Sequence, residues 1–435
     1  MVGLGCVGAL WAVGLYLHRY GLSDLAVDIG AVRSWLAGDG LYAYRSPVSR
    51  LGTAEPPAAA ILMSPGALVP LIVTGWCVAL AGVAALILAL TALVGPVVRR
   101  YGKPRRPAVL IAAALALMVE PVRATLGLGH LDLLLFGLLT ADIVALRRSA
   151  WARSRATWWP GRPASRPQRD RLPADLLRRG WATGAWAGVG TGLATALAVS
   201  PALFIAYFLL TRQWRAAGTA LGTTVSVVIG ALLIAPSATA TWLGSVLTQF
   251  DRSGPVDAQG NQSLAGVLAR LYDSTTTPVL IWLAFAGLLV AVGMIRARSA
   301  HAGGDEIEAF TLVGLTSAVV GPTSDVHELI WVLPAVLILV DAAARRRLAD
   351  RRPRAGRPAG AGWAAAAAAV LVVFAVAPVW TIGWNAYAIV LLALLTGLPW
   401  RPGVAPAVPS SRRPRPARRV AAIPGPRGSL ADRVE

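Results

Sequence analysis

The stretch IVTGWCVALAGVAALILALTALVGPV, residues 72–97, has 26 residues without one charge, and it runs into the basic segment VVRRYGKPRRP at 97–107. About 20 apolar residues suffice for a helix to cross the hydrocarbon core of a bilayer, so this stretch predicts a membrane-spanning helix that ends in a basic loop. The whole chain has the same character, with 56% hydrophobic residues and a mean hydropathy of +0.61. A soluble protein with so apolar a core is not credible.

Similar apolar windows, bounded by charge or proline, recur along the chain and predict about twelve spans. The first window has no basic segment before it and no small-residue cleavage site after it, so we interpret it as a retained span. These patterns predict an all-α polytopic membrane protein, with one transmembrane domain over 1–400 and a tail over 401–435. The predicted spans are 2–17, 72–97, 107–121, 125–147, 181–198, 200–211, 215–235, 278–296, 308–322, 328–345, 363–380 and 384–400.

The basic residues are sorted to one side of these spans. The net charge is +20, and the arginines fall in short loops that flank apolar windows. This is the positive-inside pattern, which places those loops in the cytoplasm and makes nucleic-acid binding the weaker interpretation. The loop 147–180 and the tail 401–435 are rich in Arg and Pro without apolar periodicity, so we expect them to be disordered beside anionic lipid.

The two longer loops on the other side, 18–71 and 236–277, are predicted to be extracytoplasmic. In the first, Leu25, Ile29, Val32 and Leu36 recur at helical spacing and indicate a helix that lies on the membrane surface. A second surface helix is expected after the Pro56-Pro57 pair, because proline is tolerated in a first helical turn.

Asp24, just before the first of these helices, has two interpretations. In the order Ser23-Asp24-Leu25 it is suited to be an N-cap that accepts backbone N–H bonds, which the sequence taken by itself favours. Alternatively, it is a general base at the water boundary. Asp28, one turn later, shares its face and would raise the pKa of either carboxyl by like-charge repulsion.

Other ionisable side chains collect in pairs at the same ends of the spans, where such residues are functional candidates. Each pair is equally suited to be a structural ion pair. No third ligand stands at a recognisable spacing, so no metal site is expected. Cys6 and Cys77 lie in apolar windows, which gives no support for a disulfide framework. The three pairs are Glu120 with Arg123, His130 with Asp132, and His327 with Glu328.

The second outer loop contains the polar motif GNQSLAGVLARL, residues 260–271. The adjacent side chains of Asn261, Gln262 and Ser263 are suited to hydrogen bonding with sugar hydroxyls or a phosphate, with Arg270 as a charge partner. Alternatively, the motif caps the helix that follows.

Taken in order, several segments resemble glycosyltransferase family 87, the polyprenol-phosphate-mannose-dependent alpha-1,2-mannosyltransferases of actinobacterial envelopes. The D-L-x-V opening and the NQS-x-x-G element are the most family-specific. The matching segments are SDLAVDIGAVRSWLAGDGLYAY (23–44), EPPAAAILMSPGAL (55–68), EPVRATLGLGHLDLLLFGLLTADI (120–143), GVGTGLATALAVSPALFIAYFLLTRQWRAA (188–217), NQSLAGVLAR (261–270) and VVGPTSDVHELIWVLPA (319–335).

The resemblance implies a GT-C-type bundle in which a polyprenyl-phosphate sugar enters from the bilayer and meets a lipid-linked glycan acceptor on the outer side of the cytoplasmic membrane. It further implies an inverting transfer with Asp24 as the base, which needs neither an enzyme nucleophile nor a cofactor. The substrate-binding residues it implies are Tyr42, Arg123, His130, Asp132, Asn261, Gln262, Ser263, Arg270, His327 and Glu328.

The chain departs from the family pattern at several of these places. Asp28 replaces a tyrosine, F-T-Y-P-P becomes T-A-E-P-P at 53–57, and G-Q-x-N becomes G-H-L-D at 129–132. A pair of histidines becomes His327-Glu328, and the lysine of K-L-T-P becomes Ala198. If that lysine holds the donor phosphate, its loss weakens transfer or moves phosphate recognition to another cation such as Arg123. The chain is therefore a diverged member with another donor or acceptor, or a catalytically impaired one. The alternative from another class is a secondary transporter, for which about twelve spans is a common number. No internal repeat supports the transporter, and the polar groups lie at helix ends rather than at the midplane.

Overall fold

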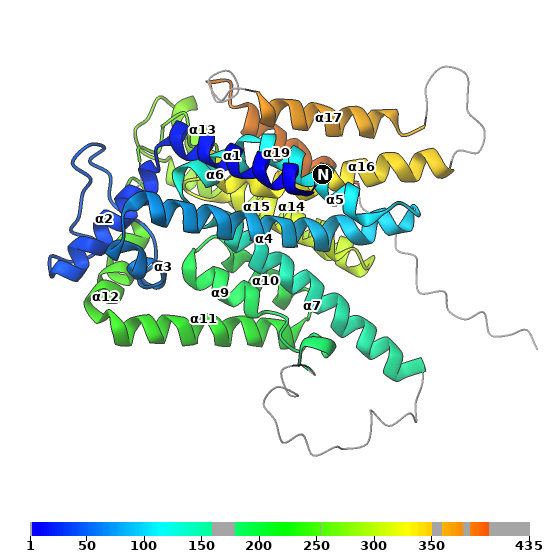
Figure 1. The fold of residues 1–435 in the computed structure, drawn as a ribbon, viewed down its shortest axis with the longest axis horizontal. Coiled ribbons are helices and arrows are strands. Elements are labelled where there is room, and N and C mark those ends of the chain that lie inside the picture. The colour runs from blue at the N-terminus through cyan, green and yellow to red at the C-terminus, as the bar shows by residue number, and fades with distance from the viewer. Residues whose placement is uncertain are drawn as a thin grey trace, which may run out of the picture.

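The structure is a computed structural model and describes residues 2–158, 178, 180–252, 254–349, 359–376 and 383–399. All regular secondary structure in these residues is helical (Figure 1), which confirms the predicted fold class. The tail 401–435 and residues 159–177 of the basic loop lie outside the described residues. The first part of that loop is helical, because α7 (Asp132–Trp158) continues eleven residues past the predicted end of its span at 147, so the prediction of disorder from 147 is wrong there.

Four helices are long and apolar enough to cross a membrane. They are α4 (Leu71–Arg100), α11 (Trp214–Ile234), α14 (Val279–Ala302) and the segment Val326–Ala349, which combines η3 (Val326–Trp331) with α16 (Val332–Ala349) and is kinked at Leu329. The pair α5 (Arg105–Met118) and α6 (Glu120–Leu128), bent by 71° where they meet, gives a fifth candidate span. The predicted number of about twelve spans is not confirmed.

Several predicted spans correspond to helices that are short or broken. Helices α9 (Val189–Leu197) and α10 (Ala202–Leu210) have nine residues each, so each extends only about 14 Å. They are separated at Ala198–Pro201, because proline disfavours helical geometry in the residue before it and lacks an N–H to donate. The remaining longer helices of the bundle are α1 (Val2–Tyr20), α15 (Glu306–Val320), α17 (Ala361–Ala375) and α19 (Ala386–Gly397).

The first outer loop folds into α2 (Ser23–Ala37), α3 (Pro57–Met63) and η1 (Ser64–Leu68), so both predicted helices are present. On α2, Leu25, Ile29 and Val32 are buried, but Leu36 is 53% exposed. The buried face of α2 therefore ends at Val32, one turn before the predicted end at Leu36. The second outer loop forms α12 (Pro236–Gly244), η2 (Val246–Thr248) and α13 (Leu264–Leu271).

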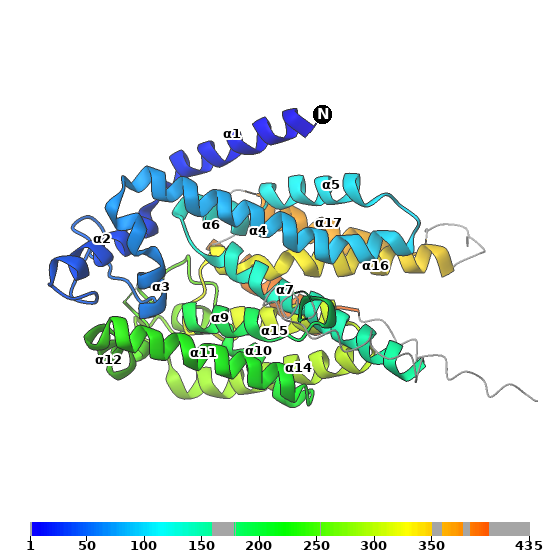
Figure 2. The ribbon, with the colours of Figure 1, turned by 60° about the horizontal axis from the view of Figure 1, so that its bottom comes forward.

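The bundle has two chemically different ends. Helices α2, α3 and α12 gather at one end, on the left of Figures 1 and 2. Helices α4 and α16 run to the opposite end, where their last turns carry Arg99 and Arg100, and Arg346 and Arg347. The separation of basic loops from polar outer loops that the sequence predicts is thus present in the fold.

Candidate functional site

The backbone before α2 turns sharply and places Asp24 beside the connection between α6 and α7. Gly21 and Leu22 both have positive φ, and the Leu22 N–H donates to the carbonyl of Gly127. The Asp24 carboxylate accepts hydrogen bonds from Nε2 of His130 at 2.8 Å and from the Ser23 hydroxyl at 2.9 Å. The N-cap of α2 is Leu22, without a side-chain bond, so the interpretation of Asp24 as the cap is wrong.

His130 and His327 form a stacked pair, here called the histidine stack. Gly129, in the left-handed conformation, ends α6 and presents His130. Its ring lies on the ring of His327, with 3.8 Å between the centroids and 12° between the planes. Nδ1 of His327 donates to Asp132 at 2.7 Å, so each ring is held by one carboxylate. The fold thus gives the two histidines a third metal-ligating neighbour, Asp24, which sequence spacing did not reveal.

Three further carboxyl groups, Asp28, Glu55 and Glu328, are half-buried close to the histidine stack. Burial raises the pKa of Asp28, and burial together with the charge on Asp28 raises the pKa of Glu55 to about 8. Burial acts in the same direction on Asp24, but the hydrogen bond from His130 and the charge on the histidines lower its pKa overall. Asp24 is therefore the carboxyl of the first outer loop that is best held as the anion.

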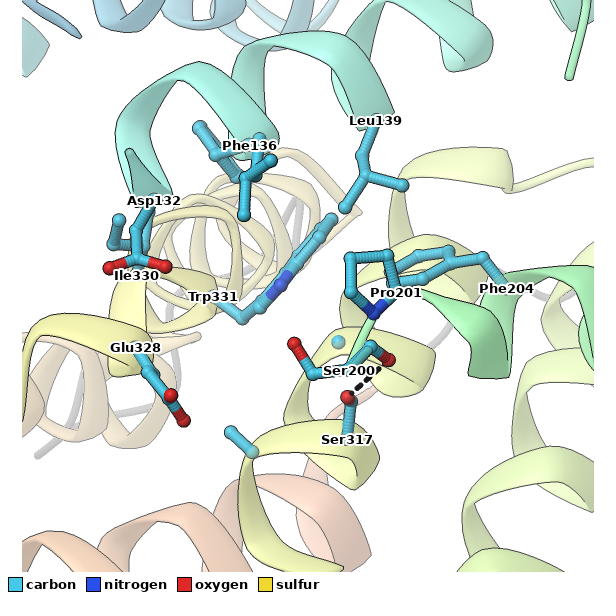
Figure 3. A pocket seen from close by; sticks show the side chains of 13 residues that line it. Asp132, Phe136, Leu139, Ser200, Pro201, Phe204, Ser317, Glu328, Ile330 and Trp331 are labelled. Atoms are coloured by element: carbon cyan, nitrogen blue, oxygen red, sulfur yellow. Dashed lines mark hydrogen bonds between the residues drawn. The ribbon is translucent and has the colours of Figure 1, made fainter. Parts of the chain in front are cut away.

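A pocket opens beside Asp132 and Glu328 (Figure 3). About 470 Å³ of space lies between the lining residues, and this volume includes open solvent. Asp132 and Glu328 lie at one side, whereas Phe136, Phe204 and Trp331 form an aromatic wall. The α9–α10 break supplies Ser200 and Pro201 to the lining, and the backbone carbonyl of Ser200 accepts a hydrogen bond from Ser317 at 2.8 Å. The pocket therefore joins polar groups to an apolar surface.

The Asn261-Gln262-Ser263 motif is buried, with exposed fractions of 3%, 1% and 0%. Asn261 donates to the carbonyl of Val256 and accepts from the N–H groups of Ser263 and Ser324. Ser263 is the N-cap of α13 and accepts from the N–H of Gly266. These bonds are internal to the protein, and they tie the second outer loop to the segment that leads into η3.

The two predicted arginine partners also have internal contacts. Arg270 donates to Asn385 and to the carbonyl oxygens of Ala258 and Asn261. Arg123 is paired with Glu120 at 2.6 Å, which is the structural ion-pair interpretation. Among the described residues, both guanidinium groups bond to partners other than the histidine stack.

Arg252, which sequence analysis did not select, joins the two outer loops. It is 6% exposed and donates to the carbonyl oxygens of Thr53 and Tyr42 while it lies 5.4 Å from the centroid of the Tyr42 ring. The Tyr42 hydroxyl donates to the backbone carbonyl of Glu55 at 2.8 Å. Arg252 thus supports the segment that carries Glu55, and no motif around it in the sequence indicates this role.

Replacing Arg252 by methionine is expected to destabilise the protein by about 2–3 kcal/mol, because two carbonyl groups lose a charged donor and are left buried. The activity that the family resemblance implies should fall in parallel, since the first outer loop is no longer held. Thermal unfolding of the purified variant measures the first effect. Lysine at the same position keeps the charge but has a single donor nitrogen, so the stability of that variant should lie between those of wild type and the methionine variant. Wild-type stability in the methionine variant would contradict this supporting role.

Alanine in place of Asn261 is expected to lower the free energy of unfolding by about 1–3 kcal/mol. The KM of the variant, measured where it is still folded, should stay within about twofold of wild type, because the side chain does not contact substrate. The reason is that the amide bonds to backbone rather than to open space. Thermal unfolding and transfer kinetics at permissive temperature measure the two quantities. A large rise in KM at unchanged stability would instead show that Asn261 contacts substrate.

Comparison with known families gives a match over residues 55–322 to the sequence profile described as glycosyltransferase family 87. A relative from Mycobacterium tuberculosis, a polyprenol-phosphate-mannose-dependent alpha-(1-2)-phosphatidylinositol mannoside mannosyltransferase, is 29% identical over 77% of this chain and 75% of its own length. A polyprenol-phosphate-mannose-dependent alpha-(1-2)-phosphatidylinositol pentamannoside mannosyltransferase from Mycolicibacterium smegmatis is 25% identical over 87% of this chain and 84% of its own.

Among solved structures, ArnT from Cupriavidus metallidurans bound to undecaprenyl phosphate aligns with 91% of this chain and 76% of its own length, at 14% identity and a TM-score of 0.34. A likeness at this level carries no argument about the arrangement of the helices. The GT-C-type bundle therefore stays a prediction.

Proposed function

Because this chain belongs to glycosyltransferase family 87, we propose that it moves a mannose-type sugar from a polyprenyl-phosphate donor to a hydroxyl of a lipid-linked glycan. Membership of the family and the presence of long apolar helices make the chain a membrane glycosyltransferase. The proposal for donor and acceptor is supported by the mannosyltransferases to which the chain is similar. The single observation that carries the proposed site is the pairing of Asp24 with the histidine stack, next to the pocket.

The proposed reaction is an inverting displacement. Asp24 takes the proton of the acceptor hydroxyl, whose oxygen forms a bond to the anomeric carbon of the donor sugar. The bond between that carbon and the phosphate oxygen breaks, and the polyprenyl phosphate leaves with the electron pair. Asp24 suits the role of base because it is 40% exposed and anionic, whereas the other carboxyl groups nearby are more deeply placed.

The pocket is the proposed place for the donor. Its aromatic wall of Phe136, Phe204 and Trp331 suits an isoprenoid chain or a sugar face, and its polar side at Asp132 and Glu328 suits sugar hydroxyls. Ala198 supplies no charge to the departing phosphate, and Arg123 and Arg270 are held by other partners. His327 is bonded to Asp132 at the edge of the pocket and is stacked on His130, so we assign the contact with the phosphate to these two histidines.

In the proposed orientation, the end of the bundle that carries α2, α3 and α12 faces away from the cytoplasm. The arginines at the opposite ends of α4 and α16 support it. In this orientation the reaction occurs on the outer side of the cytoplasmic membrane.

The test is transfer by the purified chain in vesicles that contain labelled polyprenyl-phosphate mannose and a phosphatidylinositol mannoside acceptor. We expect a labelled glycolipid whose new linkage has the anomeric configuration opposite to that of the donor. Retention of configuration would overturn the inverting mechanism. No product from folded protein with any polyprenyl-phosphate hexose would overturn the proposed function, and uptake of free sugar into the vesicles would indicate the transporter.

A further inference from the structure

Asp24 and the two rings of the histidine stack offer a set of metal ligands, which the proposed transfer does not by itself require. We propose that Asp24, His130 and His327 bind one divalent transition-metal ion, Zn²⁺ or Mn²⁺. One ligand atom from each of these residues lies within 4.8 Å of the others. The three residues come from the start of α2, the α6–α7 connection and η3, so the tertiary structure brings together two imidazoles and a carboxylate that are far apart in the chain.

The hydrogen bonds of the stack leave the required lone pairs available. Asp132 accepts from Nδ1 of His327, which orients the ring and leaves Nε2 as a metal ligand. A carboxylate behind a histidine is the usual outer partner of a metal-binding imidazole. On the other ring, Nε2 of His130 and the Asp24 carboxylate share one proton across 2.8 Å. A metal ion in place of that proton needs the two atoms to separate to about 3.3 Å, as bonds of about 2.0–2.1 Å to one centre require. The two rings must also tilt out of their stack, because the lone pairs of two nearly parallel rings do not meet at one ion.

The charges around the stack favour a cation. Asp24, Asp28, Glu55, Asp132 and Glu328 are five carboxyl groups around two histidines. The ion pairs that the described residues form here join these acids only to histidines. A divalent ion among them would favour the ionised form of the carboxyl groups whose pKa burial raises.

The ligand set indicates the kind of ion. Two imidazole nitrogens and one carboxylate oxygen suit Zn²⁺ or Mn²⁺ better than Mg²⁺ or Ca²⁺, which prefer oxygen ligands. Three protein ligands leave a coordination position open, as in catalytic rather than structural sites. The inference rests on the proposed function: the ion would take over the contact with the donor phosphate from the histidines, through its open coordination position. Asp24 would bind the ion through one carboxylate oxygen and accept the proton of the acceptor hydroxyl on the other. Ala198 stands here in place of the expected lysine.

The experiment measures metal binding by the full-length protein, purified through a tag without histidines, stripped with chelator and titrated separately with Zn²⁺ and Mn²⁺ in the absence of sugar lipids. We expect about one equivalent of ion for wild type. His130→Gln and His327→Gln should weaken binding by more than tenfold, and Asp132→Asn by roughly tenfold as an outer partner. Each variant is first tested for a wild-type unfolding midpoint, so that loss of the fold is not mistaken for loss of the site.

His301→Gln is the matched control. His301 is also paired with a carboxylate, Glu306 at 2.7 Å, but it does not belong to the group of three convergent ligands. The control should bind the ion as wild type does. The proposal is overturned if wild type holds less than a tenth of an equivalent, or if His130→Gln and His301→Gln bind equally.

The outcomes separate the two proposals, because binding is measured without transfer. Mannose transfer by a chain that binds no ion removes the metal site and leaves the proposed function. Ion binding without transfer of any hexose supports the site and removes the function. Preferential transfer of an amino sugar by a chain that binds no ion would overturn the metal site. The five carboxyl groups around the histidine stack would then be the partners of the sugar's ammonium group.

Discussion

Asparagine in place of Asp24 is expected to lower sugar transfer by about 10²–10⁴-fold, the usual contribution of a positioned general base. The amide oxygen of asparagine still accepts the hydrogen bond from His130, so the fold at the start of α2 should persist. What is lost is the capacity to accept the proton of the acceptor hydroxyl. Transfer from labelled donor in vesicles, with KM and kcat measured separately, should show the loss in kcat.

Two matched variants make this prediction specific. Asp39→Asn changes an exposed acid in the same outer loop and should leave transfer unchanged. Asp28→Asn changes the carboxyl one turn further along α2 and is expected to have a smaller effect than Asp24→Asn. If transfer collapses in Asp28→Asn and survives in Asp24→Asn, Asp28 is the base and our assignment is wrong.

Alanine in place of Asp142 is expected to cause the largest loss of stability, about 3–5 kcal/mol. Asp142, on α7, is 0% exposed, and its carboxylate accepts hydrogen bonds from the N–H groups of Gly188, Gly190 and Thr191 and from the Thr191 hydroxyl. Three of these donors are backbone groups at the start of α9, where a helix has unsatisfied N–H groups. Each buried donor left without an acceptor costs about 1–3 kcal/mol.

Thermal unfolding in detergent measures this loss, and Thr191→Val is its control. Valine removes one hydroxyl donor but leaves the three backbone bonds to Asp142, so a loss of only about 1 kcal/mol is expected. Because α9 leads into the break that lines the pocket with Ser200 and Pro201, Asp142→Ala should also reduce transfer. Equal unfolding midpoints for the two variants would show that the carboxylate does not hold α9.

Local properties of the sequence predicted the parts of the fold that depend on neighbouring residues. A run such as 72–97 is helical in hydrocarbon because its backbone groups have no other partners there, and this holds wherever it packs. Pro56-Pro57 similarly indicated the start of α3. The number of spans did not follow, because hydropathy does not show that the apolar windows 181–198 and 200–211 form helices of only nine residues each.

The candidate site was predicted only as separate pieces. Asp24, His130 and His327 were each selected from the sequence, as an acid before a helix and as ionisable groups near spans. Their association was not predictable, since His130 is 106 residues from Asp24 and His327 is 195 residues from Asp132. The polar motif at Asn261 was equally visible, but sequence could not distinguish a ligand contact from the internal hydrogen bonds that the fold shows.

The sequence by itself determined that this is a helical membrane protein with its basic residues at one end and its ionisable candidates at the other, because transfer free energies and helix signals belong to short segments. The order of the sequence motifs also indicated the family, which the family comparison confirms. Only the tertiary structure decided that two histidines stack between two aspartates, that Arg252 joins the outer loops, and that Arg123 and Arg270 are taken by internal partners. These contacts join segments far apart in the chain, and packing rather than any local preference selects them.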